Sequence, residues 1–168
     1  QGLTLLTGES GTGKTTILRR ALAIEIDGGR RRVVWVHLNN PTIGRTEFLD
    51  FLADAFALNE ASASKPRLLR ELERVLQQRH SDGVLSALVV DEAQGLSDEL
   101  LEEIRLLANI ECDTHKLLTI VLSGQPELGI RLNEWRFRHL KQRLALRCAL
   151  SALTLERSAA YIAGRTAR

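Results

Sequence analysis

The sequence is short of several residue types, and each shortage excludes a class of protein. Among 168 residues there are only two cysteines, Cys112 and Cys148, too few for a disulfide framework and far from each other in the chain, so a reducing compartment is expected. No apolar run approaches the ~20 residues of a membrane helix, and no signal peptide is recognised. Methionine is absent even at position 1. We therefore expect the chain to be part of a longer protein.

The sequence also lacks an excess of charge of either sign. The 23 Lys and Arg residues almost balance the 21 Asp and Glu residues, and a net charge of +2 is too small to indicate a nucleic-acid or membrane-surface protein. A hydrophobic fraction of 44% and a charged fraction of 26% exclude a disordered chain. The four histidines show no metal-ligand spacing and are expected to be structural or surface residues. The length suits one compact domain.

Short apolar runs alternate with amphipathic stretches along the chain. The runs predicted to be strands are Leu3–Thr7, Val33–Leu38, Leu85–Val90, Leu117–Leu122 and a short one near Cys148–Leu150. The stretches predicted to be helical are Lys14–Ile26, Phe48–Phe56, the segments after Ser64 and after Ser97, Glu134–Arg143 and Glu156–Arg165. Strands that are apolar throughout indicate burial on both faces, and interleaved helices indicate a parallel sheet. The predicted class is therefore three-layer α/β.

A glycine-rich segment directly after the first predicted strand carries the strongest functional signal. It matches G-x-x-x-x-G-K-[ST], the loop whose backbone N–H groups cradle the phosphates of a nucleotide at the start of a helix. Lys14 is expected to reach the β- and γ-phosphates, Thr15 to hold Mg²⁺, and Thr16 to lie on the α-phosphate side. The predicted nucleotide-binding residues are Gly8, Glu9, Ser10, Gly11, Thr12, Gly13, Lys14, Thr15 and Thr16.

An acidic pair, Asp91 and Glu92, follows the third predicted strand. It is expected at the carboxyl edge of the sheet, where ligands bind in open α/β folds. Asp91 is the predicted second Mg²⁺ residue, and Glu92 is placed to polarise a water that attacks the γ-phosphate. This pair favours ATP hydrolysis over phosphate transfer to another substrate.

Two further segments supply candidates for the same site. Gln125, after the fourth predicted strand, is placed to orient the attacking water, with Ser123 as the lesser candidate. The basic stretch Trp135–Arg147 offers an arginine to a neighbouring subunit's nucleotide. A solvated basic face, or one that touches DNA or an acidic partner, is the alternative for this stretch.

The chain resembles the AAA+ ATPases, and more narrowly the general secretion pathway protein A (ExeA-like) family, over nearly its whole length. The resemblance rests on the phosphate loop, on Val90–Ser97 (VDEAQGLS), on Leu118–Leu128 (LTIVLSGQPEL) and on Gln142–Leu144 (QRL). It implies a five-stranded parallel sheet of order 5-1-4-3-2, an AAA+ nucleotide-binding core over residues 1–154 and the start of a truncated helical lid over 155–168.

The resemblance also implies roles and partners. It gives ATP and Mg²⁺ as cofactors, Lys14, Gln125 and Glu92 as catalytic residues, and Arg143 as the leading arginine finger, with Arg147 second. It further implies a homo-oligomer and protein partners in an envelope secretion or pilus system. The expected location is cytoplasmic, on a bacterial protein anchored in the inner membrane.

Two alternatives stay open at this point. One is a DNA-transposition ATPase, which shares the core motifs and would bind nucleic acid; it is the less favoured reading. The other is an ATP-gated interaction module with little turnover.

Overall fold

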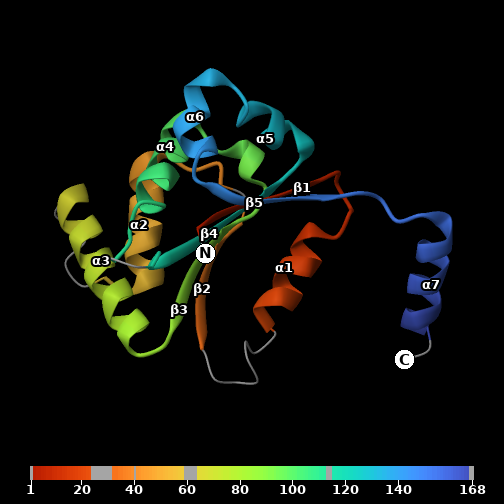
Figure 1. Ribbon diagram of the computed structural model, residues 1–168, viewed down its shortest axis with the longest axis horizontal. Helices are drawn as coiled ribbons and strands as arrows, with labels where there is room; N and C mark the ends of the chain where they lie inside the picture. Colours follow the sequence, from red (N-terminus) through yellow and green to blue (C-terminus); the bar gives the residue numbers. More distant parts are fainter. Residues whose placement is uncertain (1, 24–31, 40, 59–63, 113–114, 167–168) are drawn as a thin grey trace.

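The chain folds around a five-stranded parallel sheet (Figure 1). The computed structural model describes residues 2–23, 32–39, 41–58, 64–112 and 115–166. The strands are β1 (Leu3–Gly8), β2 (Val33–Leu38), β3 (Leu85–Val90), β4 (Leu118–Gly124) and β5 (Leu144–Leu150). Their order, β2-β3-β4-β1-β5, is the predicted order 5-1-4-3-2 read from the other edge. The predicted fold class is therefore confirmed.

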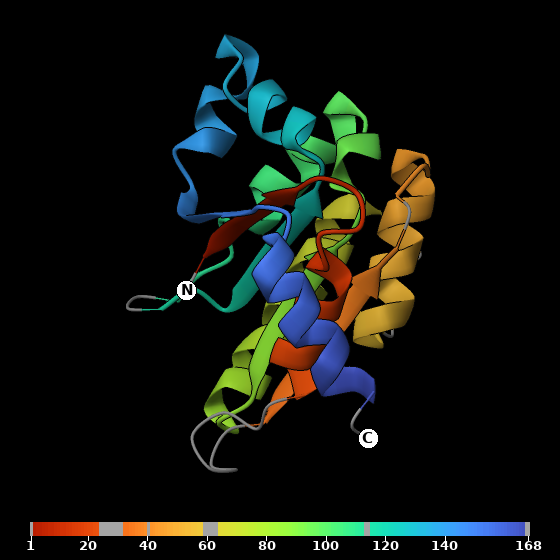
Figure 2. The ribbon, with the colours of Figure 1, turned by 90° about the vertical axis from the view of Figure 1, so that its right-hand side faces the viewer.

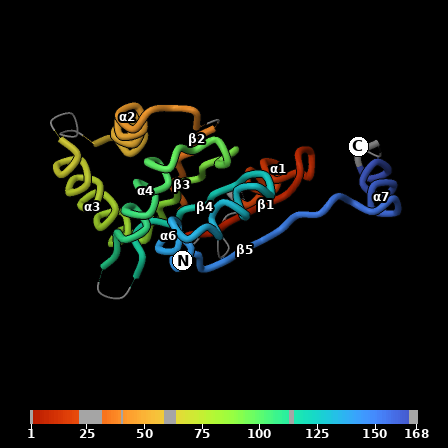
Figure 3. The backbone as a smooth tube through the Cα atoms, turned by 90° about the horizontal axis from the view of Figure 1, so that it is seen from above, coloured from red at the N-terminus to blue at the C-terminus, as the bar shows by residue number. Residues whose placement is uncertain are grey.

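Helices cover both faces of this sheet. The described helices are α1 (Lys14–Ala23), α2 (Arg45–Phe56), α3 (Lys65–Ser81), α4 (Asp98–Leu107), α5 (Pro126–Arg131), α6 (Arg138–Lys141) and α7 (Leu155–Thr166), with 3₁₀ turns η2 (Ala93–Gly95) and η3 (Trp135–Phe137). Seen along the edge of the sheet from above, α2 and α3 lie on one side of the molecule and α7 stands apart beyond β5 (Figure 3). In the side view, α7 lies in front of α1 (Figure 2).

The strands send alternate side chains to two apolar clusters of unequal size. Leu5 on β1 and Leu88 on β3 belong to the large core that α2, α3 and α4 complete. Leu6 and Val89, the next residues along, belong to a smaller cluster with Leu18 of α1. This alternation is the two-residue period of a strand. The predicted burial on both faces holds for the central strands β1, β3 and β4.

The edge strand β5 departs from the sequence-based expectation. It begins at Leu144, earlier than the predicted strand near Cys148, and it pairs with β1 along its length. All seven of its side chains are at least partly exposed; Leu146, for example, is 54% exposed. An apolar run therefore marks the strand correctly but overstates its burial, because a strand at the edge of a sheet has fewer neighbours.

Local signals at the helix ends are partly confirmed. Ser97 caps α4, since its Oγ accepts a hydrogen bond of 3.2 Å from the N–H of Leu100. Ser64 precedes α3 with Pro66 in the first turn, but the Ser64 side chain makes no capping hydrogen bond. The predicted helix Glu134–Arg143 is instead the short pair η3 and α6. Among the described helices, none is long and apolar enough to cross a membrane.

The unequal burial of two leucines gives a direct test of this core. Leu88 on β3 is fully buried, whereas Leu146 on β5 is half-exposed. We predict that Leu88→Ala lowers the free energy of unfolding by about 2–5 kcal/mol, because it leaves a cavity in the core. Leu146→Ala, the matched control, should change it by less than about 1 kcal/mol. Urea denaturation followed by circular dichroism measures both, and equal losses would contradict the assignment of the core.

Candidate nucleotide site

Three strand ends meet at the carboxyl edge of the sheet. β1 runs into the glycine-rich loop, β3 into Asp91 and β4 into Gln125. Because β4 lies between β1 and β3, these three segments are neighbours at one edge. This is the edge at which ligands bind in open α/β sheets. The structure therefore brings together the predicted loop, acidic pair and Gln125.

The glycine-rich loop has a backbone that other residues adopt with difficulty. Gly11 and Gly13 have φ angles of 78° and 90°, in the region that favours glycine. At Gly8, a Cβ atom would lie 2.9 Å from the carbonyl oxygen of Leu150 and 2.7 Å from the Thr12 hydroxyl. The loop thus turns tightly against β5 before α1 begins at Lys14. Its shape suits backbone N–H groups that face an anion.

Lys14 is a buried cation held by the loop. The residue is 5% exposed, and its Nζ donates hydrogen bonds of 2.7 Å to the carbonyl oxygen of Gly8 and 3.0 Å to that of Glu9. Among the residues that the structure describes, no carboxylate forms an ion pair with it. A buried charge without a counter-ion is costly. An anionic group bound in the loop would supply the missing negative charge.

Thr15 and Asp91 join the first helix to the end of β3. The Thr15 hydroxyl donates a 2.6 Å hydrogen bond to Oδ2 of Asp91, while Oδ1 accepts one of 3.1 Å from the N–H of Glu92. Asp91 itself is 1% exposed. A hydroxyl and a carboxylate, both oxygen donors, are the ligand chemistry that Mg²⁺ prefers. The donor set therefore fits the predicted metal.

The surroundings of Asp91 keep it ionised. Burial alone would raise the pKa of this carboxyl group, but the hydrogen bonds from the Thr15 hydroxyl and the Glu92 N–H, with the charge of His37, outweigh it and lower the pKa. Ser123 is the lesser sequence candidate for the γ-phosphate; its side chain is fully buried, and its hydroxyl has no hydrogen-bond partner among the described residues, so that role stays a prediction.

Glu92 stands in an uncommon backbone conformation and has one side-chain partner that sequence reasoning missed. Its φ and ψ angles are 53° and 37°, the left-handed region, which a residue other than glycine seldom adopts. Nε2 of Gln94 donates a 2.6 Å hydrogen bond to Oε2 of Glu92. Oε1 of Gln94 accepts a 3.1 Å bond from the N–H of Gln125. Sequence analysis named Gln94 only as part of a motif shared with the resembling family. Nothing in its spacing indicates that the 3₁₀ turn η2 brings its side chain to Glu92.

The arginines of the basic stretch are distributed over several places. Arg143 is exposed and precedes β5, so it lies at the amino-terminal edge, beside Gly2 and opposite the glycine-rich loop. Arg147 donates a 3.4 Å hydrogen bond to Asn133 on the exposed face of β5. The guanidinium of Arg138 stacks on the ring of Trp135. The structure thus does not bring Arg143 to the site of its own chain.

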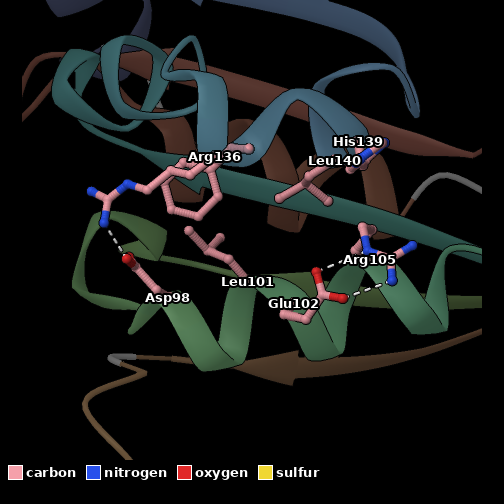
Figure 4. A pocket seen from close by; sticks show the side chains of 8 residues that line it. Asp98, Leu101, Glu102, Arg105, Arg136, His139 and Leu140 are labelled. Carbon is pink, nitrogen blue, oxygen red and sulfur yellow. Dashed lines mark hydrogen bonds and ion pairs between the residues drawn. The ribbon is translucent and has the colours of Figure 1, made fainter.

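A cavity of about 220 Å³ lies between α4 and the η3–α6 segment (Figure 4). Arg136 forms an ion pair with Asp98 there, and Arg105 forms one with Glu102. Hydrogen bonds, first of all from Arg131, lower the pKa of Asp98. None of the residues that line this cavity belongs to the glycine-rich loop. Arg136 is an exposed arginine that pairs with Asp98 and Glu134.

Known proteins match the chain in sequence. A family profile described as "AAA domain" matches residues 1–132. General secretion pathway protein A of Aeromonas hydrophila is 38% identical over 165 residues, which are 96% of this chain and 29% of that protein. The chain therefore spans less than a third of the length of this relative.

Solved structures match it in fold. The Aeropyrum pernix ORC2 protein, in its ADPNP and ADP complexes, superposes with a TM-score of 0.69 at 12% identity, covering 91% of this chain and 42% of that one. Drosophila ORC bound to DNA gives 0.62 at 22% identity, covering 90% and 38%. At these identities the likeness concerns the fold alone.

The lowered pKa of Asp91 has a measurable consequence for stability. Because the folded state holds this carboxylate at a pKa below that of the unfolded chain, its ionised form stabilises the fold above the unfolded pKa, and the contribution is lost as the pH falls through the folded pKa. We predict that the free energy of unfolding of the wild type falls more steeply below about pH 4 than that of Asp91→Asn.

Urea denaturation between pH 7 and pH 3 measures this difference. Asp50→Asn, which removes an exposed carboxylate from α2, is the matched control for the loss of one acidic group. Parallel profiles for the wild type and Asp91→Asn would show that Asp91 gains nothing from its hydrogen bonds.

Proposed function

The chain belongs to the AAA domain family and is a homologue of general secretion pathway protein A, and we propose that it binds ATP with Mg²⁺ and hydrolyses it. The observation that carries this proposal is the buried ammonium of Lys14, bonded to two loop carbonyls and paired with no carboxylate among the described residues. A triphosphate is the ligand whose charge and size match a cationic loop at a helix N-terminus.

In the proposed complex, Lys14 exchanges its bonds to Gly8 and Glu9 for bonds to the β- and γ-phosphates. The backbone N–H groups of Gly11, Thr12 and Gly13 surround the phosphates, and Thr16, exposed on the first turn of α1, lies on the α-phosphate side. Ser10, also exposed on the loop, completes the predicted cradle.

Thr15 and Asp91 would hold Mg²⁺, with the carboxylate bound directly or through water. Bound Mg²⁺ neutralises charge on the phosphate oxygens. Because Asp91 stays ionised and its two oxygens are already directed by Thr15 and by the Glu92 backbone, little rearrangement is needed. The lowered pKa of Asp91 supports this role.

We assign Glu92 as the general base that accepts a proton from the attacking water. It directly follows the proposed metal residue Asp91, and its left-handed backbone turns the chain sharply at that point. Gln125 lies nearby through its backbone bond to Gln94, which supports its proposed part in orienting the water.

Two substitutions separate binding from hydrolysis. Lys14→Ala should weaken ATP binding by about 100-fold, since charged hydrogen bonds to the phosphates are lost. Glu92→Gln should bind ATP as the wild type does and hydrolyse it roughly 10²–10⁴-fold more slowly. Lys141→Ala, an exposed lysine on α6, is the control for the first. Titration with a fluorescent ATP analogue and a phosphate-release assay measure both; equal hydrolysis by Glu92→Gln and the wild type would remove Glu92 from the mechanism.

Gln94 is proposed as a positioning residue for this base. One end of its amide holds the Glu92 carboxylate and the other holds the Gln125 backbone. It therefore links the proposed base to the segment that follows β4. Misplacing a reacting group by about 1 Å can reduce the rate 100-fold.

We predict that Gln94→Ala lowers kcat for ATP hydrolysis by about 10-fold or more, with KM within about 2-fold of the wild type, because the variant loses orientation and not binding. Gln77→Ala, an exposed glutamine on α3, is the matched control. Steady-state kinetics of ATP hydrolysis measure kcat and KM for both variants. A rise in KM with kcat unchanged would assign Gln94 to nucleotide binding instead.

For the active state we propose a homo-oligomer in which Arg143 completes the site of a neighbouring subunit. β5 spans the six residue steps between Leu144 and Leu150, about 20 Å, which separates Arg143 from the loop of its own chain. The proposed core covers residues 1–154, and α7 begins the helical lid.

The biological role follows from the homologue and is also a proposal. Its name, general secretion pathway protein A, supports a cytoplasmic domain that powers or gates assembly of a secretion or pilus complex in the bacterial envelope. ATP binding without phosphate release by the oligomeric full-length protein would select the alternative of an ATP-gated module with little turnover.

A further inference from the structure

Three side chains of ligand type meet away from the nucleotide site. An imidazole nitrogen of His80, the Sγ of Cys112 and an imidazole nitrogen of His115 lie within 4.8 Å of one another. The rings of His80 and His115 are 5.4 Å apart between centroids. Cys112 is partly exposed and His115 is exposed. Sequence analysis did not identify this cluster, because His80 and Cys112 are 32 positions apart and the spacing of Cys112 and His115 was not singled out.

A short hairpin before β4 presents two of these residues. The N–H of Cys112 donates a 2.9 Å hydrogen bond to the carbonyl oxygen of His115, and the N–H of His115 returns one of 3.3 Å. Glu111 and Lys116, the next pair outward, form an antiparallel bridge and an ion pair. The pairing fixes Cys112 and His115 side by side on the hairpin, with the spacing Cys-x-x-His.

The third residue comes from the last turn of α3. α3 leads into β3 and the hairpin leads into β4, and these two strands are neighbours in the parallel sheet. The end of α3 and the hairpin therefore lie at the same amino-terminal edge. His80 reaches the hairpin across this edge, so that the cluster joins two separate parts of the chain.

We propose that His80, Cys112 and His115 form a binding site for a divalent transition metal, with Zn²⁺ as the physiological ion. A thiolate and two imidazoles are a typical Zn²⁺ ligand set, with Zn–S near 2.3 Å and Zn–N near 2.0–2.1 Å. Such bonds place tetrahedral donors roughly 3.3–3.8 Å apart. The present spacing of up to 4.8 Å exceeds that range by about 1 Å, so the three side chains would draw together by about that distance when the metal binds. A water completes the fourth position.

This site is distinct from the one proposed for ATP. It lies at the amino-terminal edge of the sheet, whereas the glycine-rich loop and Asp91 lie at the carboxyl edge. We therefore assign it a structural or regulatory role: the metal ties the end of α3 to the hairpin before β4. Binding proceeds with the release of the thiol proton of Cys112 to solvent, since the thiolate is the ligand.

Cobalt, which substitutes for zinc and absorbs visible light, tests the proposal on the reduced, tag-free 168-residue chain. Titration with Co²⁺ should produce a thiolate-to-cobalt charge-transfer band and tetrahedral d–d bands, and Zn²⁺ should displace both. Cys112→Ser should abolish the charge-transfer band. His80→Asn and His115→Asn should each weaken Co²⁺ binding by at least about 10-fold, a loss that even outer-shell partners of a metal produce.

Matched controls use the same residue types elsewhere. Cys148→Ser on β5 and His139→Asn on α6 should leave the spectrum unchanged. Circular dichroism verifies that every variant is folded, and Zn²⁺ should raise the Tm of the wild type but not of Cys112→Ser. No charge-transfer band in the wild type, its loss in Cys148→Ser, or its persistence at full affinity in both histidine variants would overturn the proposal. ATP binding is not measured, so the outcome does not depend on the proposed function.

Discussion

The hydrogen bond between the Thr15 hydroxyl and the Asp91 carboxylate is the interaction on which the candidate site depends. These residues are 76 positions apart in sequence, and they come from the segments after β1 and β3, which are not neighbours in the sheet because β4 lies between them. Strands in a sheet are spaced by about 4.8 Å, so β1 and β3 lie roughly 10 Å apart. The chain after β1 returns over β4, which α1 contacts, and this brings the two oxygens within 2.6 Å of each other. The site is therefore a product of topology as much as of motif.

The arrangement of Lys14 in the glycine-rich loop suits the binding of an anion. Lys14 is withdrawn from solvent and satisfied by carbonyl oxygens, which are weaker partners for an ammonium than an anion is. The free energy needed to remove the Lys14 ammonium from water is already spent in folding. A phosphate bound in the loop would therefore interact with a cation that has little water left to lose. Gly8 contributes by its lack of a side chain, since its close approach to Leu150 fixes the loop against β5. The edge strand β5 is poorly buried, but its last residue Leu150 packs against the start of the loop.

The sequence predicts this fold well where its signals are short in range. The runs Val33–Leu38 and Leu85–Val90 match β2 and β3 residue for residue, because apolar β-branched runs between turn residues leave little choice. The start of α4 after Ser97 follows from capping chemistry in the same way. The positions of the glycine-rich loop and the acidic pair were also predictable, since each motif adjoins a strand end and parallel strands bring such ends to one edge.

What the sequence does not predict depends on contacts between distant segments. The exposure of β5 follows from its place at the edge, and the 3₁₀ turn η2 directs Gln94 back to Glu92, a contact that no periodicity indicates. Arg143 is a further case. Its position in the sequence shows only that it precedes β5, whereas the parallel register with β1 shows that it lies at the edge of the sheet opposite the loop of its own chain.

The two edges of the sheet carry different kinds of potential metal ligands. Oxygen donors and a cation gather at the carboxyl edge, around Thr15, Asp91 and Lys14, whereas nitrogen and sulfur donors gather at the amino edge, around His80 and Cys112. Hard oxygen ligands favour Mg²⁺, and thiolate with imidazole favours Zn²⁺. The strands β3 and β4 run between the two groups, because each begins next to the histidine–cysteine cluster and ends beside Asp91 or Gln125. α3 and the hairpin thus lead directly into the two strands that carry the proposed catalytic residues at their other ends.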